Sequence, residues 1–117
     1  MIDRILSYAV GDDLAASREF YAGLFGLDVA MEDPVLALRS PANPTAQVLV
    51  LPKGMDRVAP NLGIDVGEPA NVDALHAEVV RRGLEVVYPL TDEPWGVRRF
   101  FVRDPGGTVV NVLAHLR

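Results

Sequence analysis

Residues 108–114 read T-V-V-N-V-L-A, an apolar run that is interrupted by the primary amide of Asn111. Burying an amide without a hydrogen-bond partner costs roughly 2–7 kcal/mol, so this side chain needs either a partner or an opening. Two interpretations follow. Asn111 faces a cleft, where water or a ligand satisfies it, or it lies in the core, where neighbouring protein groups do so.

The other reactive side chains form no recognisable catalytic pattern. His76 lies within a helical pattern and is expected near the surface, whereas His115 shares the strand parity of Asn111 and faces either the mouth of a cleft or solvent. The serines at positions 7, 17 and 40 have no nearby histidine to act as a base. Asp65 shares the parity of Asn61 and is either a cleft residue or a solvated acid at a strand end. We therefore assign no catalytic residue.

The composition restricts the possible partners. The chain has 117 residues, enough for one domain, and it has no cysteine for disulfides or thiolate metal sites. Its net charge of −5 argues against a nucleic-acid partner and is compatible with a cationic small molecule. The first residues do not resemble a signal peptide, and no apolar segment approaches the ~20 residues that cross a bilayer. We expect a cytoplasmic protein with no membrane partner.

The two halves of the chain resemble each other. L-S-Y-A-V-G at 6–11 matches L-G-I-D-V-G at 62–67, and G-L-D-V at 26–29 matches G-L-E-V at 83–86. A duplicated unit of about 55 residues explains why such matches occur in the same order. We place module 1 at about 1–53, a linker at about 53–60 and module 2 at about 61–117, all within a single domain.

Each unit predicts a strand, a helix and three further strands. The strands are expected at 5–10, 27–31, 35–40, 46–51, 61–66, 84–88, 97–103 and 108–114. Asp12 or Asp13 can cap the first helix and Asn71 the second, and Gly26 and Gly83 suit the left-handed residue that ends a helix. Two such βαβββ units predict an α+β fold, in which a cupped, eight-stranded mixed sheet surrounds a cleft.

Two longer motifs, ASREFYAGLFGLDV and EPWGVRRFFVRDPGGTVVNVL, resemble the vicinal oxygen chelate superfamily. That superfamily includes glyoxalase I, extradiol dioxygenases, metal-dependent epimerases and bleomycin resistance proteins. The resemblance covers essentially the whole chain and implies two βαβββ units in one cupped sheet. It also implies a homodimer, because members often complete the cleft across subunits.

The enzymes of this superfamily hold a divalent metal with His, Glu or Gln from the first and last strands of each unit. The resemblance places these positions at Ile5 or Leu6, Gln47, Asn61 and Asn111. None of them is an imidazole or a carboxylate, and neutral amides are weak ligands for hard cations, zinc or iron. We therefore expect no metal and no cofactor.

The resemblance is closest to the metal-free branch, whose members sequester bleomycin-like antibiotics and share the P-W-G…R-D-P-x-G run. Trp95 would stack on a flat, polar, partly cationic ligand. Arg99 and Phe101 share one strand parity and Arg98 and Phe100 the other. One pair lines the cleft, and parity alone leaves both choices open. The predicted ligand-binding set is Trp95, Asn111, Asn61, Gln47, Arg99 and Phe101.

Other functions stay open. One is a metal-dependent glyoxalase-, epimerase- or dioxygenase-type enzyme with atypical ligands, and another is a structural or regulatory dimer with a vestigial cleft. A metal-free enzyme that uses Asp65 or Tyr8 has no supporting motif. A metal assay separates the metal enzyme from the others, and ligand screening separates the binding protein from the structural dimer.

Overall fold

The computed structural model describes residues 2–117. The strands are β1 (Arg4–Gly11), β2 (Asp28–Met31), β3 (Leu36–Arg39), β4 (Ala46–Pro52), β5 (Leu62–Asp65), β6 (Val86–Glu93), β7 (Val97–Arg103) and β8 (Val109–His115). The helices are α1 (Leu14–Arg18), which continues into the π-helical segment η1 (Glu19–Leu24), and α2 (Pro69–Arg81). Each half thus has the predicted order of a strand, a helix and three strands. Within residues 2–117 no helix is long and apolar enough to cross a membrane.

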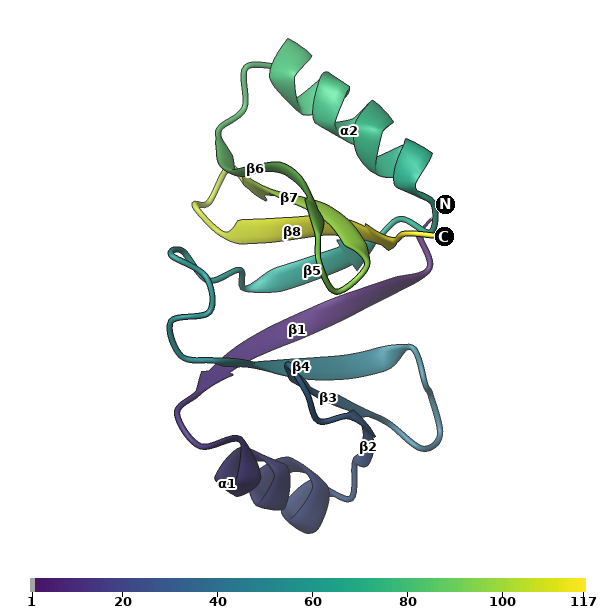
Figure 1. Ribbon diagram of the computed structural model, residues 1–117, viewed down its shortest axis with the longest axis vertical. Coiled ribbons are helices and arrows are strands. Elements are labelled where there is room, and N and C mark those ends of the chain that lie inside the picture. Colours follow the sequence, from purple (N-terminus) through teal and green to yellow (C-terminus); the bar gives the residue numbers. More distant parts are fainter. Residues whose placement is uncertain (1) are drawn as a thin grey trace.

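All eight strands form one mixed sheet with the order β2-β3-β4-β1-β5-β8-β7-β6. In each half the first strand runs parallel to the fourth, β1 beside β4 and β5 beside β8. The halves meet where β1 and β5 pair antiparallel, in the middle of the sheet (Figure 1). This repetition is what a duplicated unit requires, and the predicted α+β fold is confirmed.

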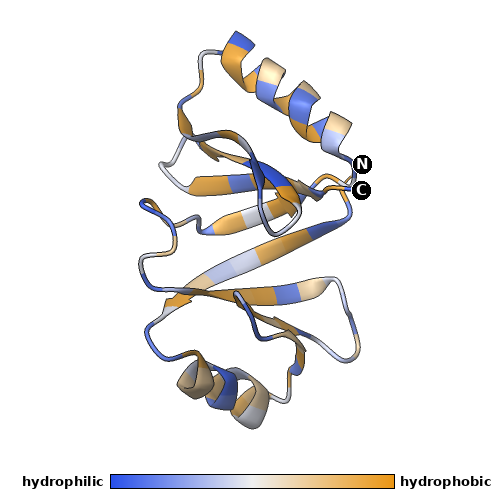
Figure 2. Cartoon of the chain, viewed as in Figure 1, coloured by the Kyte–Doolittle hydropathy of each residue, from blue (hydrophilic) through white to orange (hydrophobic). Residues whose placement is uncertain are grey.

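The two helices lie at opposite ends of the sheet (Figure 1) and pack on separate apolar clusters. Beneath α2 the buried cluster consists of Val66, Val72, Phe100, Val110, Val112 and Ala114. Leu36, Leu38 and Val50 are the buried residues of the cluster that includes Leu14 of α1. A third cluster, Leu6, Val97 and Leu113, comes from the alternate residues of the strands and so lies on the other face. Figure 2 shows these apolar stretches as orange segments along the central strands.

The predicted helix ends are mostly confirmed. Asp13 caps α1, because its Oδ1 accepts a hydrogen bond from the backbone N–H of Ala16 at 3.1 Å. Gly26 and Gly83 have φ values of +74° and +69°, the left-handed conformation expected there. The prediction that Asn71 caps the second helix is wrong. Pro69 starts α2 two residues earlier, and the Asn71 side chain instead donates to the carbonyl of Val66 at 2.8 Å.

Strand β6 is longer than the predicted 84–88. Its sequence contains Pro89, which has no N–H to donate and is usually found at strand ends or sheet edges. β6 is the edge strand beside β7, and its register shifts between Tyr88 and Thr91. The irregular edge tolerates the proline, so the strand continues to Glu93.

Candidate functional site

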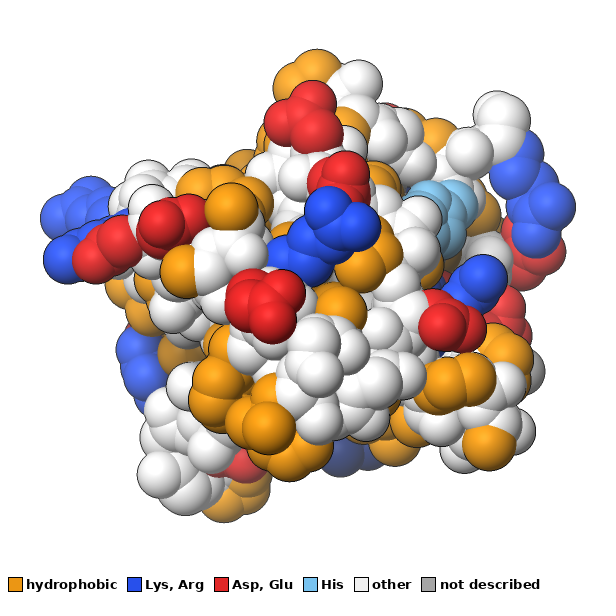
Figure 3. All heavy atoms as spheres, turned by 90° about the horizontal axis from the view of Figure 1, so that it is seen from below, with side chains coloured by type: hydrophobic (Ala, Val, Ile, Leu, Met, Phe, Trp, Pro, Cys, Tyr) orange, Lys and Arg blue, Asp and Glu red, His pale blue; other side chains and the backbone are white. Residues whose placement is uncertain are grey.

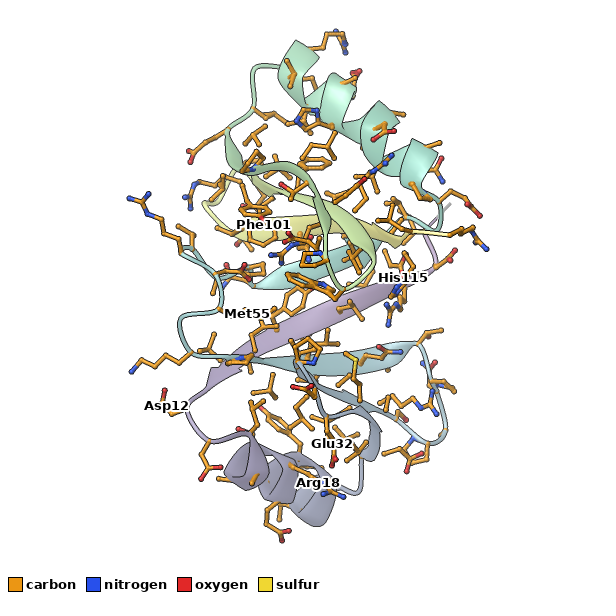
Figure 4. The ribbon with its side chains drawn as sticks, viewed as in Figure 1. Asp12, Arg18, Glu32, Met55, Phe101 and His115 are labelled. Atoms are coloured by element: carbon orange, nitrogen blue, oxygen red, sulfur yellow. The ribbon has the colours of Figure 1, made fainter. Side chains whose placement is uncertain are left out.

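The sheet face opposite the helices carries a cleft of about 520 Å³. Its floor includes Leu6, Tyr8, Gln47, Leu49, Asn111 and Leu113. One wall comes from β3 and the segment before it, and the other comes from Trp95, Val97, Arg99 and His115. Met55 and Pro60 of the linker also line the cleft. In Figure 4, Met55 and His115 lie towards opposite ends of β1, so the cleft runs along that strand.

Asn111 lies on the cleft floor yet is only 4% exposed. Its Nδ2 donates to the hydroxyl of Tyr8 at 2.9 Å, whereas its Oδ1 is buried and has no hydrogen-bond partner within residues 2–117. The two interpretations of this residue therefore each hold in part. Asn111 faces the cleft, and a protein group satisfies one end of its amide.

Tyr8 fills the middle of the cleft floor. A Cβ built on Gly63 of β5 would lie 2.5 Å from the Tyr8 hydroxyl, so a glycine at that position is needed to make room for the ring. Burial raises the pKa of Tyr8 to about 12, although the hydrogen bond from Asn111 works in the opposite direction. The hydroxyl is therefore neutral at ordinary pH. Since it accepts from Asn111, its own hydrogen is available to a ligand or to water.

The four strands that carry the metal ligands in the superfamily's enzymes contribute neighbouring residues here. Leu6 of β1 lies opposite Gln47 of β4 and Gly63 of β5, and Gly63 lies opposite Asn111 of β8. This row offers one aliphatic side chain, two amides and a glycine. Gln47 Oε1 already accepts from Arg4 Nη1 at 2.6 Å. Zinc and iron sites are built from imidazole, thiolate or carboxylate ligands, and hard cations need charge from their ligands, so this uncharged row does not fit a divalent metal.

Other side chains within residues 2–117 do not supply the metal ligands that this row lacks. Across residues 2–117 no cluster of three or more His, Cys, Asp or Glu side chains is placed to hold a metal ion. His115 lies 3.2 Å from a guanidinium nitrogen of Arg4, and Arg4 is paired with Asp65 at 2.8 Å. Asp65 is only 5% exposed. It is therefore neither a solvated acid nor a free base.

The strand register corrects one of the predicted positions and decides between the two alternatives at another. The residue of β5 in the row is Gly63 rather than Asn61, whose Oδ1 accepts from the backbone N–H of Val109 at 3.1 Å. Asn61 thus helps β5 to pair with β8 and is not among the residues that line the cleft. Of the two choices on β1, Leu6 is buried in the cleft, whereas Ile5 is 57% exposed on the other face.

Arg99 is a buried cation beside the cleft. Its guanidinium binds Asp56 at 2.8 Å and Glu93 at 2.7 Å, and all three side chains are at most 7% exposed. Burial alone would lower the pKa of Arg99, but the hydrogen bonds and charges of the two carboxylates outweigh this and raise it. Tyr88 adds a hydrogen bond to Glu93 at 2.9 Å. The group is a buried network of one cation and two carboxylates, in which Asp56 Oδ2 has no hydrogen-bond partner within residues 2–117.

Three aromatic rings surround this guanidinium. Its central carbon lies 4.9 Å from the ring centroid of Tyr88, 5.2 Å from that of Trp95 and 4.8 Å from that of Phe101. Arg99 itself therefore occupies the position between acids and aromatic rings that we expected a cationic ligand to take. Phe101, 1% exposed, supports the network from beneath and does not line the cleft.

The residues of opposite parity on β7, Arg98 and Phe100, face α2. Arg98 pairs with Asp73 of that helix at 2.9 Å, and Phe100 is fully buried beneath it, with its ring 5.0 Å from that of His76. The structure thus places Arg99 and Phe101 on the cleft side of the strand, but of the two only Arg99 lines the cleft. Trp95, 44% exposed, and Gln47 line the cleft as well. Ligand binding by these residues stays a prediction.

Sequence reasoning missed Arg4, Arg39 and Met55 as cleft residues, and it named Leu6 only as an alternative to Ile5 and Tyr8 only for a catalytic role. Arg4, Leu6 and Tyr8 share one parity on β1, and the polar pair on that face was a signal that could have placed Tyr8 beside Asn111. Arg39 was detectable in the same way at the end of β3. Met55 belongs to a linker without periodicity, so no sequence pattern locates it.

The chain belongs to the glyoxalase/bleomycin resistance protein/dioxygenase superfamily, whose family model matches residues 2–112. A comparison with curated proteins finds no match. The family membership agrees with the fold and with the strands that form the cleft.

Solved structures share this fold at low sequence identity. One described as an NAD-dependent benzaldehyde dehydrogenase from Legionella pneumophila has a TM-score of 0.80 and 17% identity, over 95% of this chain and 98% of that one. Methylmalonyl-CoA epimerase from Mycobacterium tuberculosis has a TM-score of 0.76 and 18% identity, over 99% and 90%. A superfamily member from Vibrio splendidus 12B01 has a TM-score of 0.64 and 14% identity, over 95% and 97%. At these identities the similarity shows the fold alone.

Proposed function

We propose that the chain is a metal-free protein that binds a small molecule in this cleft. The supporting observation is the row of Leu6, Gln47, Gly63 and Asn111, which replaces a metal-ligand set with groups that bind metal poorly. The cleft itself, at about 520 Å³, has the size and mostly apolar lining of a small-molecule site. Loss of metal ligands without loss of the cleft favours binding over metal chemistry.

The proposed role is sequestration of a natural product, such as an antibiotic. Trp95 offers an exposed aromatic surface at the cleft wall, and a planar ligand would stack there. The Tyr8 hydroxyl can donate to such a ligand, and the unpartnered Asn111 Oδ1 could accept from it once a small side-chain movement uncovers the atom. The proposal includes a cytoplasmic location for the protein.

Trp95 is the only tryptophan, so its fluorescence reports on the cleft. We would titrate the protein with planar and glycopeptide-type natural products and follow the emission. A saturable change that Asn111→Ala weakens would support the proposal. Asn43→Ala is the matched control, because it removes an amide from an exposed loop away from the cleft. If no ligand changes the emission and none is detected by calorimetry, the binding function is wrong.

The runner-up is a metal-dependent enzyme of the glyoxalase, epimerase or dioxygenase type. Membership of the superfamily favours it, because neighbours of the same fold include an epimerase. The row of Leu6, Gln47, Gly63 and Asn111 argues against a metal enzyme, which would need metal ligands from outside this row.

We also infer a homodimer. Phe20, Leu24 and Phe25 on the outer side of the first helical segment are 51%, 66% and 63% exposed. Figure 3, which views the molecule from the α1 end, shows apolar side chains in patches among charged ones. Exposed apolar patches of this kind favour an interface.

A further inference from the structure

Arg39 differs from the two other arginines that line the cleft. Arg4 is paired with Asp65, and Arg99 is paired with two carboxylates. Arg39 is exposed, and within residues 2–117 it has no salt-bridge partner at 4.0 Å or less. Among the described residues, Arg39 is therefore the cleft arginine that is not paired with a carboxylate.

Further hydrogen-bond donors lie beside Arg39. Arg39 is directly opposite Gln47 in the pairing of β3 with β4, and Gln47 is bound to Arg4. Directly opposed side chains lie about 4.5–5.5 Å apart at their Cβ atoms, so the Arg39 side chain starts next to this pair. Arg4 in turn contacts His115. Arg4 already donates to Asp65 and Gln47, and Gln47 donates to the carbonyl of Pro44, so Arg39 is the cleft donor at this end with no partner among the described residues.

Two nearby acids do not pair with Arg39. Asp28 lies directly opposite Arg39 on β2 and starts as close to it as Gln47 does, but it forms no ion pair with Arg39 and is not among the cleft-lining residues. Asp33 lines the cleft beyond the other end of β3, roughly 13 Å or more along an extended strand at ~3.3 Å per residue.

The cleft becomes apolar away from Arg39. Along β3 and β4 the next cross-strand pair on the same face is Ala37 with Leu49, and Val35 and Leu51 follow on the two strands. Met55 of the linker closes that region. The cleft therefore has a cationic end and a longer apolar end.

We propose that the cleft binds an organic anion: a carboxylate, seated against Arg39, on an apolar body that extends over Ala37 and Leu49. A guanidinium matches the two oxygens of a carboxylate with two parallel hydrogen bonds. The apolar body gains from leaving water. This inference rests on the proposed binding function and replaces the cationic ligand expected from the acidic composition.

The test compares two probes that differ only in charge, 1-naphthaleneacetate and its neutral amide, 1-naphthaleneacetamide. Calorimetry would measure the affinity of each for the wild-type protein, for Arg39→Gln and for Arg82→Gln. Arg82 is the exposed C-cap residue that follows α2, on the other side of the sheet, and its replacement removes the same formal charge. Neither arginine is buried, so both variants are expected to fold.

We expect the wild-type protein to bind the carboxylate about tenfold more tightly than the amide, a ratio typical of one charge-assisted contact. Arg39→Gln should bring the ratio close to one and leave the amide affinity unchanged, whereas Arg82→Gln should leave both affinities unchanged. Equal binding of the two probes by the wild-type protein, or a ratio that survives Arg39→Gln, overturns the anion inference and leaves the binding function standing. If neither probe binds while a natural product alters Trp95 fluorescence, the anion inference alone fails. If nothing binds at all, the proposed function fails with it.

Discussion

The hydroxyl of Tyr8 lies 2.9 Å from Nδ2 of Asn111, although the two residues are 103 positions apart. Tyr8 belongs to the first strand of the first module and Asn111 to the last strand of the second, and β5 lies between them. This hydrogen bond joins the two modules at the floor of the cleft. It also explains how an amide can stand in an apolar strand.

Removal of the amide should have a small effect on stability. We expect Asn111→Ala to lower the free energy of unfolding by about 1 kcal/mol or less, the net value of one neutral hydrogen bond. The change also removes the unpartnered Oδ1, and water in the cleft can reach the Tyr8 hydroxyl. Urea unfolding would measure the difference. A loss on the order of 3 kcal/mol would show that Asn111 is a core amide instead.

The order of strands and helices was readable from the sequence, because apolar periodicity and the internal repeat are local signals. The boundaries that failed depend on context. Asn71 looked like a cap until Pro69 started the helix, and β6 continues past Pro89 because it is an edge strand.

The candidate site was readable only in part. The predicted ligand-binding set included Asn111 and Arg99, but parity left open which face of strand 97–103 lines the cleft, and it did not reveal that Arg99 would bind Asp56 of the linker. That contact joins residues 43 positions apart and depends on how the linker folds over the sheet. That Arg39 has no paired carboxylate, unlike Arg4 and Arg99, depends on long-range contacts within the described residues and could not be predicted from the sequence.

Alkaline pH should destabilise the protein through Tyr8. The pKa of this hydroxyl is raised from 10.0 to about 12, so the folded state holds its proton where the unfolded chain releases it. The resulting stability is fully present below pH 10 and is lost as the pH rises towards 12, by up to about 2–3 kcal/mol. Tyr8→Phe should show a weaker loss over that range in urea unfolding. Identical pH profiles for the two proteins would contradict the burial of this hydroxyl.

The protein should contain no tightly bound divalent metal. The row of Leu6, Gln47, Gly63 and Asn111 offers no imidazole or carboxylate. Elemental analysis of protein purified without chelator is the measurement, and we expect far less than one metal ion per chain. Close to one equivalent of zinc, nickel, manganese or iron, lost on Asn111→Ala, would favour the enzyme function.

The chain should be a homodimer in solution. Burial of its exposed apolar side chains, among them Phe20, Leu24 and Phe25, would stabilise a pair of subunits. An obligate interface typically buries about 2,000 Å² or more in total. Light scattering at micromolar concentration should give twice the mass of the chain, and Phe25→Glu should shift the protein towards monomer if this patch takes part. A wild-type protein that is monomeric at that concentration would refute the prediction.

Arg99 should contribute far more to stability than its neighbour Arg98. Arg99→Met leaves the buried carboxylates of Asp56 and Glu93 without their cation, and breaking such a buried pair costs about 3–5 kcal/mol. Arg98→Met is the matched control, because the acids that Arg98 binds on the other face are half exposed and water can solvate them. Thermal and urea unfolding should show a large loss for the first variant and a much smaller one for the second. Trp95 emission should also change in Arg99→Met, since the indole loses the cation beside it. Equal, small losses in the two variants would mean that water reaches the two carboxylates once the linker moves. The buried network would then not be what holds the linker over the cleft.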